Sequence, residues 1–386
     1  QKTVHGKPLC YLDNASTTQK PQQVLDALLS AYVEDCANIH RGVHTLSQRA
    51  THRYEAVRET VRRFLNAPRA GEVIFTRGTT EAINLLAHSL GHSRVERGDE
   101  VLISAFEHHS NLVPWQRLCD ERGANLRILP LALPAERMLQ DLPAYLSPRT
   151  RIVALSQASN AIGTILPIAQ AIAIVRRVAP PAVVVVDGAQ AVPHLPVDIQ
   201  ALDCDFYAFS GHKLYGPTGV GVLWGRAALL AELPPWQSGG DMVLSVTLER
   251  TQLQAPPHKF EAGTPPIAEV IGLGAAEIAR PPRRPARDVA LDARRGLMGA
   301  ARRHRLVPRP RRVVRRRGGH ADVRLVHRPG RPDPVCSRAG PDRPERQEHG
   351  PCLRGGTVEG DGLLGVRSHR RLRAERNPLA CGQGEG

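Results

Sequence analysis

Short apolar runs alternate with longer amphipathic stretches through the first two thirds of this 386-residue chain. The short runs are rich in Val, Ile, Leu and aromatic residues, and they predict strands at Glu72–Thr76, Glu100–Ser104, Leu126–Leu131, Arg151–Ser156, Ala182–Val186, Phe206–Ser210 and Gly219–Trp224. The longer stretches repeat apolar residues at helical spacing, and they predict helices at Pro21–Val33, Gln48–Leu65, Asn111–Arg122 and Pro167–Val178. Strands joined by helical crossovers pair in parallel. The chain therefore predicts an α/β fold with a wound, mostly parallel sheet covered by helices.

One lysine follows the end of a predicted strand, in the segment SGHKLYGPTG. Lys213 comes three residues after Ser210 and directly after His212, just before a Gly-Pro turn. A buried, partnered lysine at such a place is a candidate nucleophile that forms a Schiff base with a carbonyl group. A lysine at a strand end is more often a solvated cap, so this segment alone leaves both interpretations open.

A carboxylate ends the preceding strand. Asp187 follows the run Val183 to Val186, at the edge where open α/β sheets bind their ligands. Pyridoxal phosphate needs a lysine for its covalent link and an acid beside its pyridinium nitrogen. Lys213 and Asp187 supply both groups. Without the lysine motif, Asp187 would be interpreted as a turn or helix-cap residue.

A candidate phosphate site follows the first predicted sheet strand. The segment Arg77-Gly78-Thr79-Thr80-Glu81 leads into a helical pattern with apolar residues at 83, 85, 86 and 90. The backbone N–H groups at a helix N-terminus bind anions, and threonine hydroxyls add donors. Ser210 and His212 are placed to complete this site from the lysine segment. Helix capping alone would also explain the Gly-Thr-Thr sequence.

Two adjacent histidines, His108 and His109, follow another strand in the segment EHHSN. One imidazole is a candidate for stacking on a pyridine ring, although such pairs are more often structural or metal-binding. No third ligand stands at zinc spacing from this pair, so the sequence predicts no metal site.

Many segments together resemble the class V aminotransferase group of pyridoxal-phosphate enzymes, and within it the cysteine desulfurases of the SufS type. The resemblance extends from about residue 11 to 276 and rests on YLDNASTTQKP, NIHRGVHTLSQRAT, RGTTEAINLLA, EHHSNLVPWQ, SNAIGT, VDGAQAV, DCDFYAFSGHKLYGPTG and FEAGTPP. It implies an aspartate-aminotransferase-like fold. The large cofactor domain would span residues 14–270, and a small domain would be built from both chain ends, beginning with residues 1–13.

The resemblance also implies roles for individual residues. Lys213 would hold the cofactor covalently, Asp187 would contact the ring nitrogen, Gln190 the ring hydroxyl and His108 the ring face. Asn160 would approach the substrate carboxylate. The phosphate would be bound by Thr79, Thr80, Ser210 and His212, and by Thr264 from a second subunit, which implies a homodimer.

The implied reaction converts L-cysteine to L-alanine, and an enzyme cysteine takes the sulfur as a persulfide. An acceptor protein of iron-sulfur cluster assembly would then receive that sulfur. The family carries its nucleophile in a segment like R-x-G-x-x-C-A and a carboxylate-binding arginine in one like R-A-S-x-x-x-Y-N. This sequence contains neither segment. A cofactor-binding remnant without the nucleophile and a selenocysteine lyase are therefore alternative functions.

The composition changes completely after about residue 277. Residues 279–386 contain 27 Arg, no Lys and 11 acidic residues, so this tail accounts for the whole net charge of +15. It contains no Phe, Tyr or Trp. Such a segment buries too little apolar surface to offset the cost of ordering its backbone. We therefore interpret residues 271–386 as an aberrant, Arg/Pro/Gly-rich tail in place of the C-terminal small domain, and expect the helix near residues 21–33 to lose its packing partner.

Three explanations of the tail remain: an arginine-rich arm for nucleic acid, a low-complexity linker, and a shifted reading frame. An arm without aromatic residues lacks the means to stack bases, so nucleic-acid binding is not expected. A GC-rich gene read out of phase yields Arg, Pro, Gly and Ala and would end a family match abruptly. The sequence favours a shift between residues 272 and 282.

The remaining features concern the cellular compartment. The seven cysteines form no CxxC pair, and no basic-then-apolar leader stands at the start of the sequence. These observations predict a reducing cytoplasm. No stretch of 18 apolar residues occurs, so no membrane span is expected. Cys204 is predicted to be a small buried residue ahead of a strand, and Cys336, Cys352 and Cys381 fall in the tail.

Overall fold

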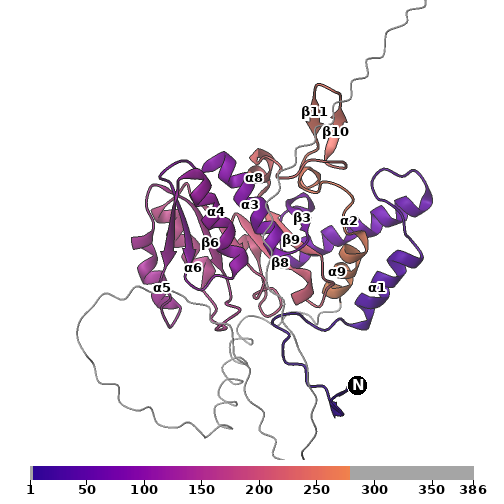
Figure 1. The fold of residues 1–386 in the computed structure, drawn as a ribbon, viewed down its shortest axis with the longest axis horizontal. Coiled ribbons are helices and arrows are strands. Elements are labelled where there is room, and N and C mark those ends of the chain that lie inside the picture. The colour runs from indigo at the N-terminus through magenta and orange to yellow at the C-terminus, as the bar shows by residue number, and fades with distance from the viewer. Residues whose placement is uncertain (1–2, 279–386) are drawn as a thin grey trace, which may run out of the picture. The chain divides into compact units, whose positions relative to one another are not determined.

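The computed structural model describes residues 3–278, and the predicted tail from residue 279 onward, with its three cysteines, lies outside them. A seven-stranded sheet lies at the centre, in the order β3-β9-β8-β7-β6-β4-β5 (Figure 1). Its strands are β3 (Val73–Thr76), β4 (Glu100–Ser104), β5 (Asn125–Leu129), β6 (Thr150–Ser156), β7 (Val183–Asp187), β8 (Phe206–Ser210) and β9 (Gly221–Gly225). Strand β9 pairs antiparallel with both of its neighbours, and the other pairings are parallel. The predicted wound, mostly parallel sheet is confirmed.

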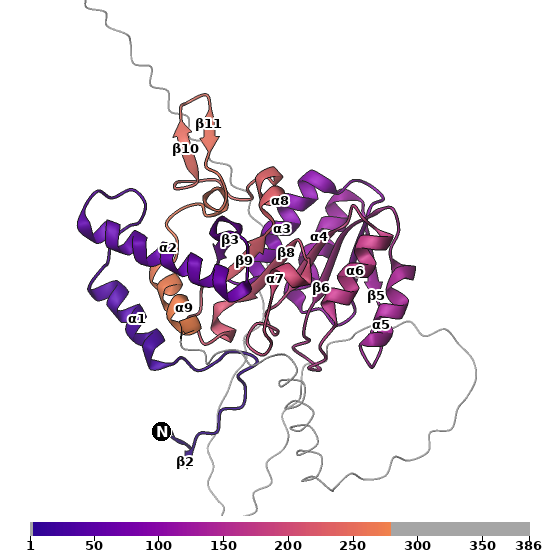
Figure 2. The same ribbon diagram turned by 180° about the vertical axis from the view of Figure 1, so that it is seen from behind.

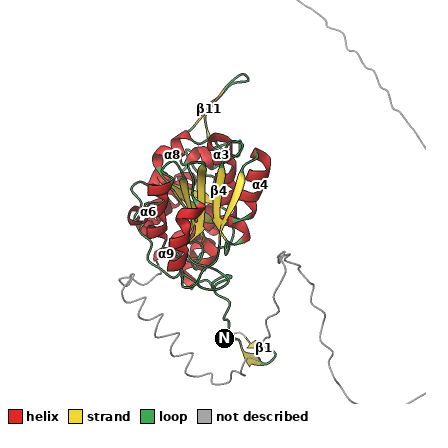
Figure 3. Ribbon diagram, turned by 90° about the vertical axis from the view of Figure 1, so that its left-hand side faces the viewer, coloured by secondary structure: helices red, strands yellow, loops and turns green. Residues whose placement is uncertain are grey.

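Helices cover both faces of this sheet (Figure 2). They are α2 (Thr45–Leu65), α3 (Thr79–Arg94), α4 (Val113–Arg122), α5 (Glu136–Asp141), α6 (Ile168–Val178), α7 (Ile199–Leu202) and α8 (Ala227–Glu232). Figure 3 shows the strands between α6 on one side and α4 on the other. The four valines of β7 are all buried, alternately against the α2 and α6 side and against the α3 and α4 side. Burial on both faces explains why this strand is a continuous apolar run.

Two helices from opposite ends of the described sequence pack together beside the sheet. Helix α1 (Gln22–Val33) places Ala31 against Ala268 and Ile271 of α9 (Ile267–Ile278). Helix α1 therefore has a packing partner, contrary to expectation, and α9 runs across the predicted domain boundary at residue 270. The opposite face of α1 is exposed, with Leu29 64% and Val33 72% accessible.

Short elements that the sequence did not predict complete the described chain. These are the two hairpins β1 (Thr3–Val4) with β2 (Lys7–Pro8) and β10 (Val243–Val246) with β11 (Thr251–Leu253), and the single turns η1 (Ala70–Glu72), η2 (His109–Asn111), η3 (Leu142–Tyr145), η4 (Gly211–Lys213) and η5 (His258–Phe260). No helix among residues 3–278 is long and apolar enough to cross a membrane.

One close backbone contact brings two site segments together. A Cβ added at Gly221 on β9 would lie 2.4 Å from the Cα of Gly78, which stands directly before α3. Only glycine fits at this approach, because any side chain would overlap the neighbouring backbone. The contact holds the start of α3 beside the end of β8, where Ser210 stands.

Candidate active site

A cavity of about 390 Å³ lies at the carboxyl ends of the central strands. The structure brings nine of the ten predicted site residues into its lining: Thr79, Thr80, His108, Asn160, Asp187, Gln190, Ser210, His212 and Lys213. They come together because parallel strands present their carboxyl ends at one edge of a sheet.

Lys213 ends the single turn η4, which directly follows β8. Its side chain is half-buried. Burial lowers the pKa of the Lys213 ammonium, and the carboxylate of Asp187 partly opposes this effect. A lowered pKa increases the neutral fraction of the amine, which is the form that attacks a carbonyl group. The alternative of a solvated cap does not describe this lysine.

Asp187 ends β7 and is 4% exposed. Its Oδ1 accepts a hydrogen bond of 2.9 Å from the backbone N–H of Ala189. Burial raises the pKa of this carboxyl group, while the Ala189 N–H and the charge of Lys213 act in the opposite direction. Asp187 is thus a turn residue and a cavity residue at once, and its two sequence interpretations are compatible.

The N-terminus of α3 forms the anion-binding end of the cavity. Ser210 Oγ accepts the backbone N–H of Thr79 at 2.9 Å and lies 2.8 Å from the Thr79 hydroxyl. Gly78 has a φ of 153°, a conformation that side chains rarely adopt. Hydroxyl groups and helix N–H groups therefore gather at this end, in a pattern suited to a phosphate.

His108 provides a neutral imidazole at the cavity wall. Its Nδ1 accepts the backbone N–H of Ser110 at 3.2 Å and lies 2.8 Å from the Ser110 hydroxyl. With Nδ1 as the acceptor, the proton of the neutral ring is assigned to Nε2. Burial lowers the pKa of His108, and the nearby positive charge of Lys213 lowers it further. His109 lies outside the cavity lining.

Gln190 and Asn160 occupy different surroundings. The Gln190 side chain is 7% exposed, and its Nε2 donates to the backbone carbonyl of Ala15 at 2.7 Å. Asn160 is exposed in the turn after β6. The Gln190 amide is therefore held by the N-terminal segment, whereas the Asn160 residue is open to solvent.

The sequence did not single out the segment that holds the backbone of the lysine turn. The His212 carbonyl accepts the N–H and the hydroxyl of Thr18 at 3.0 and 2.9 Å, and the ammonium of Lys20 at 3.0 Å. Tyr215 also donates its N–H to the Thr18 hydroxyl at 2.8 Å. This segment belongs to YLDNASTTQKP, one of the motifs that carry the family resemblance. That membership was the only sign in the sequence that Thr18 and Lys20 lie near the site.

Glu107 is a second residue whose importance the sequence did not show. Its carboxylate accepts hydrogen bonds from the hydroxyls of Ser104 and Ser156, from the Ser156 N–H at 3.0 Å and from the Asn111 amide at 2.7 Å. Burial raises the pKa of Glu107 to about 7, and these donors oppose the rise. Ser156 also lines the cavity, and Glu107 directly precedes His108 in the sequence, so this network adjoins two lining residues.

Thr264 and the cysteines stand apart from the cavity. Thr264 lines a different pocket, with Arg77 and Trp236. Among the described residues no cysteine lines the cavity: two are exposed, and burial raises the pKa of Cys119 to about 11 and that of Cys204 to about 12. Cys204 is buried ahead of β8, as predicted.

The donor set fits pyridoxal phosphate. An amine of lowered pKa, a buried carboxylate, a neutral imidazole and a helix N-terminus with hydroxyl groups all border one cavity. These are the groups that this cofactor needs at its aldehyde, ring nitrogen, ring face and phosphate. The fold and the site thus define a protein of the pyridoxal-phosphate-binding class.

The chain belongs to the class V aminotransferase family, whose model matches residues 10–278. A probable cysteine desulfurase of Mycobacterium leprae is 51% identical over 276 residues, which cover 72% of this chain and 45% of that protein. A cysteine desulfurase of Dickeya dadantii is 52% identical over 278 residues, covering 72% of this chain and 67% of its own length. The chain thus spans between about half and two thirds of the length of these relatives.

Solved structures give the same fold. The cysteine desulfurase CsdA of Escherichia coli, in its S-sulfonic acid form, matches with a TM-score of 0.65 and 47% identity, covering 69% of this chain and 67% of its own. The cysteine desulfurase of Thermococcus onnurineus matches with a TM-score of 0.68 and 36% identity, covering 76% and 73%.

Proposed function

We propose that this protein is a pyridoxal-phosphate-dependent cysteine desulfurase that converts L-cysteine to L-alanine. The observation that carries the proposal is the cavity shared by Lys213 and Asp187 at the ends of β8 and β7. Support comes from relatives named cysteine desulfurase at 51–52% identity. The sulfur would pass through a persulfide to an acceptor protein that serves iron-sulfur cluster assembly.

Each site residue has a proposed task. Lys213 holds the cofactor covalently, His108 stacks on its ring, Gln190 binds its hydroxyl group, and Asn160 approaches the substrate carboxylate. The phosphate is bound by Thr79, Thr80, Ser210 and His212. When bound, the cofactor withdraws electrons from the α-carbon of the amino acid.

Asp187 is suited to the ring nitrogen because only one of its oxygens is occupied. Oδ1 accepts the Ala189 N–H, whereas Oδ2 accepts no hydrogen bond from the described residues. A buried carboxylate with one free oxygen binds an N–H group strongly, because the hydrogen bond compensates for its lost hydration. This contact would restore the charged form of Asp187.

The finer parts of the proposal concern assembly and location. We propose a cytoplasmic homodimer in which Thr264 reaches the phosphate of the partner subunit. Residues 14–270 form the large domain and residues 1–13 begin the small one. The sequence lacks the family's nucleophile segment, and a shifted frame near residues 272–282 would account for this. Translation of resequenced coding DNA in all three frames tests that explanation.

The function is tested with the full chain supplied with pyridoxal phosphate. Borohydride reduction followed by peptide mass analysis should locate the cofactor on Lys213, and Lys213→Ala should remove the label. Lys7→Ala, at an exposed position of β2, should retain it. A label elsewhere, or none, would contradict the assigned cofactor site.

A second measurement concerns the reaction itself. Alanine released from L-cysteine supports a desulfurase, and faster release from L-selenocysteine would indicate a selenocysteine lyase instead. A labelled protein that releases alanine from neither substrate would be a cofactor-binding remnant, which is the function that the missing nucleophile segment favours.

A further inference from the structure

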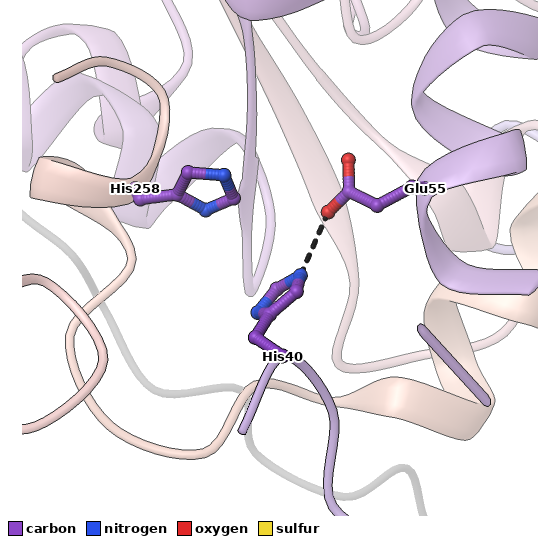
Figure 4. A group of neighbouring side chains, drawn as sticks. All are labelled: His40, Glu55 and His258. Carbon is purple, nitrogen blue, oxygen red and sulfur yellow. Dashed lines mark hydrogen bonds and ion pairs between the residues drawn. The ribbon is translucent and has the colours of Figure 1, made fainter. Parts of the chain in front are cut away.

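Two histidines and a glutamate meet outside the cofactor cavity. His40 lies in the loop before α2, Glu55 lies on α2, and His258 begins η5. Figure 4 shows the two imidazole rings and the carboxylate facing a common space. One ligand atom from each residue lies within 4.8 Å of the other two, and His40 Nε2 is 3.0 Å from Glu55 Oε1.

The charges around this cluster leave a negative excess. Arg58 donates to Glu55 at 2.9 Å and to Glu261 at 2.8 Å, so two carboxylates share one guanidinium. Among the described residues the His258 ring makes no hydrogen bond, and its centroid lies 5.1 Å from that of the His40 ring. A cation bound here would meet the carboxylate of Glu55 and the imidazole rings of His40 and His258.

The three side chains are held in place by neighbours that are not ligands. Arg58 contacts both oxygens of Glu55 and so fixes the carboxylate. The backbone N–H of His40 donates to the hydroxyl of Thr51 at 2.9 Å, and His40 has a φ of 67°, in the left-handed region that non-glycine residues seldom adopt. Contacts that orient the ligands are typical of metal sites.

The cluster also opens to solvent on one side. His40 and His258 line a cavity of about 470 Å³ together with Gln254, the paired charges Arg41 and Asp241, and residues of β10. Three protein ligands beside an open cavity leave a fourth coordination position for water.

We propose that His40, Glu55 and His258 form a binding site for a divalent metal ion of the zinc type. Two imidazole nitrogens and one carboxylate oxygen suit zinc and its transition-metal neighbours, whereas magnesium and calcium prefer oxygen ligands alone. Binding through Nε2 requires the His40 tautomer that carries its proton on Nδ1, so the ring stays neutral and the metal ion takes the place of the hydrogen bond between Nε2 and Glu55. In a tetrahedral site with bonds of about 2.0–2.1 Å the ligand atoms lie roughly 3.4 Å apart, so the side chains need to move by about 1 Å.

Sequence spacing could not indicate this site. Glu55 is 15 residues from His40, and His258 comes from the far end of the described chain. The prediction of no metal site rested on the ligand spacing around His108 and His109. The new site shares no residue with the cofactor cavity, so it does not depend on the proposed function.

The test measures zinc binding by the full chain in competition with a chromophoric chelator. His88 and His92 lie one turn apart on α3, with ring centroids 4.2 Å apart and ring planes inclined by 42°, so this pair is a competing place for zinc in the test. Both are therefore replaced by Gln in every protein compared. In this background His258→Gln should lower the affinity for the most tightly bound zinc ion. The loss should exceed the roughly 10- to 100-fold expected when a residue that only supports a ligand is replaced. A background protein that binds no zinc would overturn the proposal.

Matched variants separate the site from other effects. His52→Gln alters an exposed histidine on α2 outside the cluster and should leave zinc binding unchanged. His40→Asn should weaken binding as much as His258→Gln while keeping the backbone, because Asn tolerates a positive φ. Equal zinc affinity in the background protein and in both cluster variants would overturn the proposal, as would displacement of zinc by equimolar magnesium. Circular dichroism checks that each variant is folded.

Discussion

Both the cofactor cavity and the surroundings of Arg58, which include Glu55 and Glu261, contain buried charged groups. The surroundings disfavour the charged forms in the cavity and favour the charged form of Arg58. In the cavity, burial lowers the pKa of Lys213 and raises that of Asp187, so both charged forms are disfavoured. Around Arg58, burial also acts against the charge, but Glu261 and Glu55 outweigh it and raise the pKa of the guanidinium. Arg58 also lies over the ring of Phe75 at 4.6 Å. The close pairing of Arg58 with Glu261 stabilises the fold, whereas Lys213 and Asp187 lack such a pairing in the cavity and gain partners when a ligand binds.

Replacing Arg58 with Met should produce the largest loss of stability. Glu261 would keep its buried carboxylate without a cation, which costs about 3–5 kcal/mol of the free energy of unfolding. Urea denaturation measures the loss. Arg63→Met on the same helix is the control, because Arg63 is 66% exposed and 3.9 Å from Glu59. A loss below about 1 kcal/mol for Arg58→Met would remove the contrast between the two regions.

The pH dependence of stability should reveal Glu107. Its pKa is about 7 in the folded protein against an ordinary value of 4.5, so between these pH values the folded state binds more protons than the unfolded state. The free energy of unfolding therefore falls as the pH rises from 4.5 to 7, by roughly 3 kcal/mol, and then levels off. Glu107→Gln should abolish this fall.

Denaturation at pH 5 and pH 8 measures that difference. Glu249→Gln, at an exposed position in the β10–β11 hairpin, should retain the pH dependence of the unchanged protein. If Glu107→Gln shows the same fall as the unchanged protein, Glu107 is not the group that titrates.

Ser210→Ala should have an intermediate effect. The buried N–H of Thr79 loses its acceptor, which costs about 1–3 kcal/mol. The affinity for pyridoxal phosphate should fall as well, because the same hydroxyl stands at the anion-binding end. Ser245→Ala, which removes an exposed hydroxyl on the β10–β11 hairpin, is the control for both measurements. Unchanged stability and affinity would show that Ser210 does not support the start of α3.

Lys213→Met should change stability least and function most. The lysine ammonium is partly desolvated without a full set of partners, so its removal should alter the free energy of unfolding by less than about 1 kcal/mol. Covalent cofactor binding should disappear, as the visible absorbance reports. Because Arg58→Met inserts the same side chain, the two variants compare the regions directly. Equal losses of stability would contradict the distinction.

The sequence predicted the sheet from local patterns, whereas the nine cavity residues came from local patterns together with the family resemblance, which alone supplied Asn160 and Gln190. A strand buried on both faces, such as β7, must be apolar throughout, and the residue after it must lie at the sheet edge. Strand ends therefore place Lys213 and Asp187 at this edge, while their roles were inferred from the two residues together and from the resemblance. The observed bounds of the helices and strands differ from the predicted ones by a few residues, because caps and loop contacts determine where each element ends.

Contacts between distant segments could not be predicted in this way. The Glu107 network joins the end of β4, the following loop and β6, and the His40–Glu55–His258 cluster joins two loops and a helix. No periodicity specifies which loops meet, since loop positions depend on packing. Helix α1 likewise found its partner in α9 through contacts between the two ends of the described chain.

The Thr18 contacts make the beginning of the chain part of the active site. The carbonyl beside Lys213 receives the N–H and hydroxyl of Thr18 and the ammonium of Lys20, about 190 residues away in sequence. An engineered truncation between Lys20 and Pro21 would therefore remove four donors from the lysine turn, because the Thr17 hydroxyl also donates to the His212 carbonyl. A truncation that removes Thr18 and Lys20 would therefore disturb the site as directly as a substitution in the cavity, and an expression design should keep these residues.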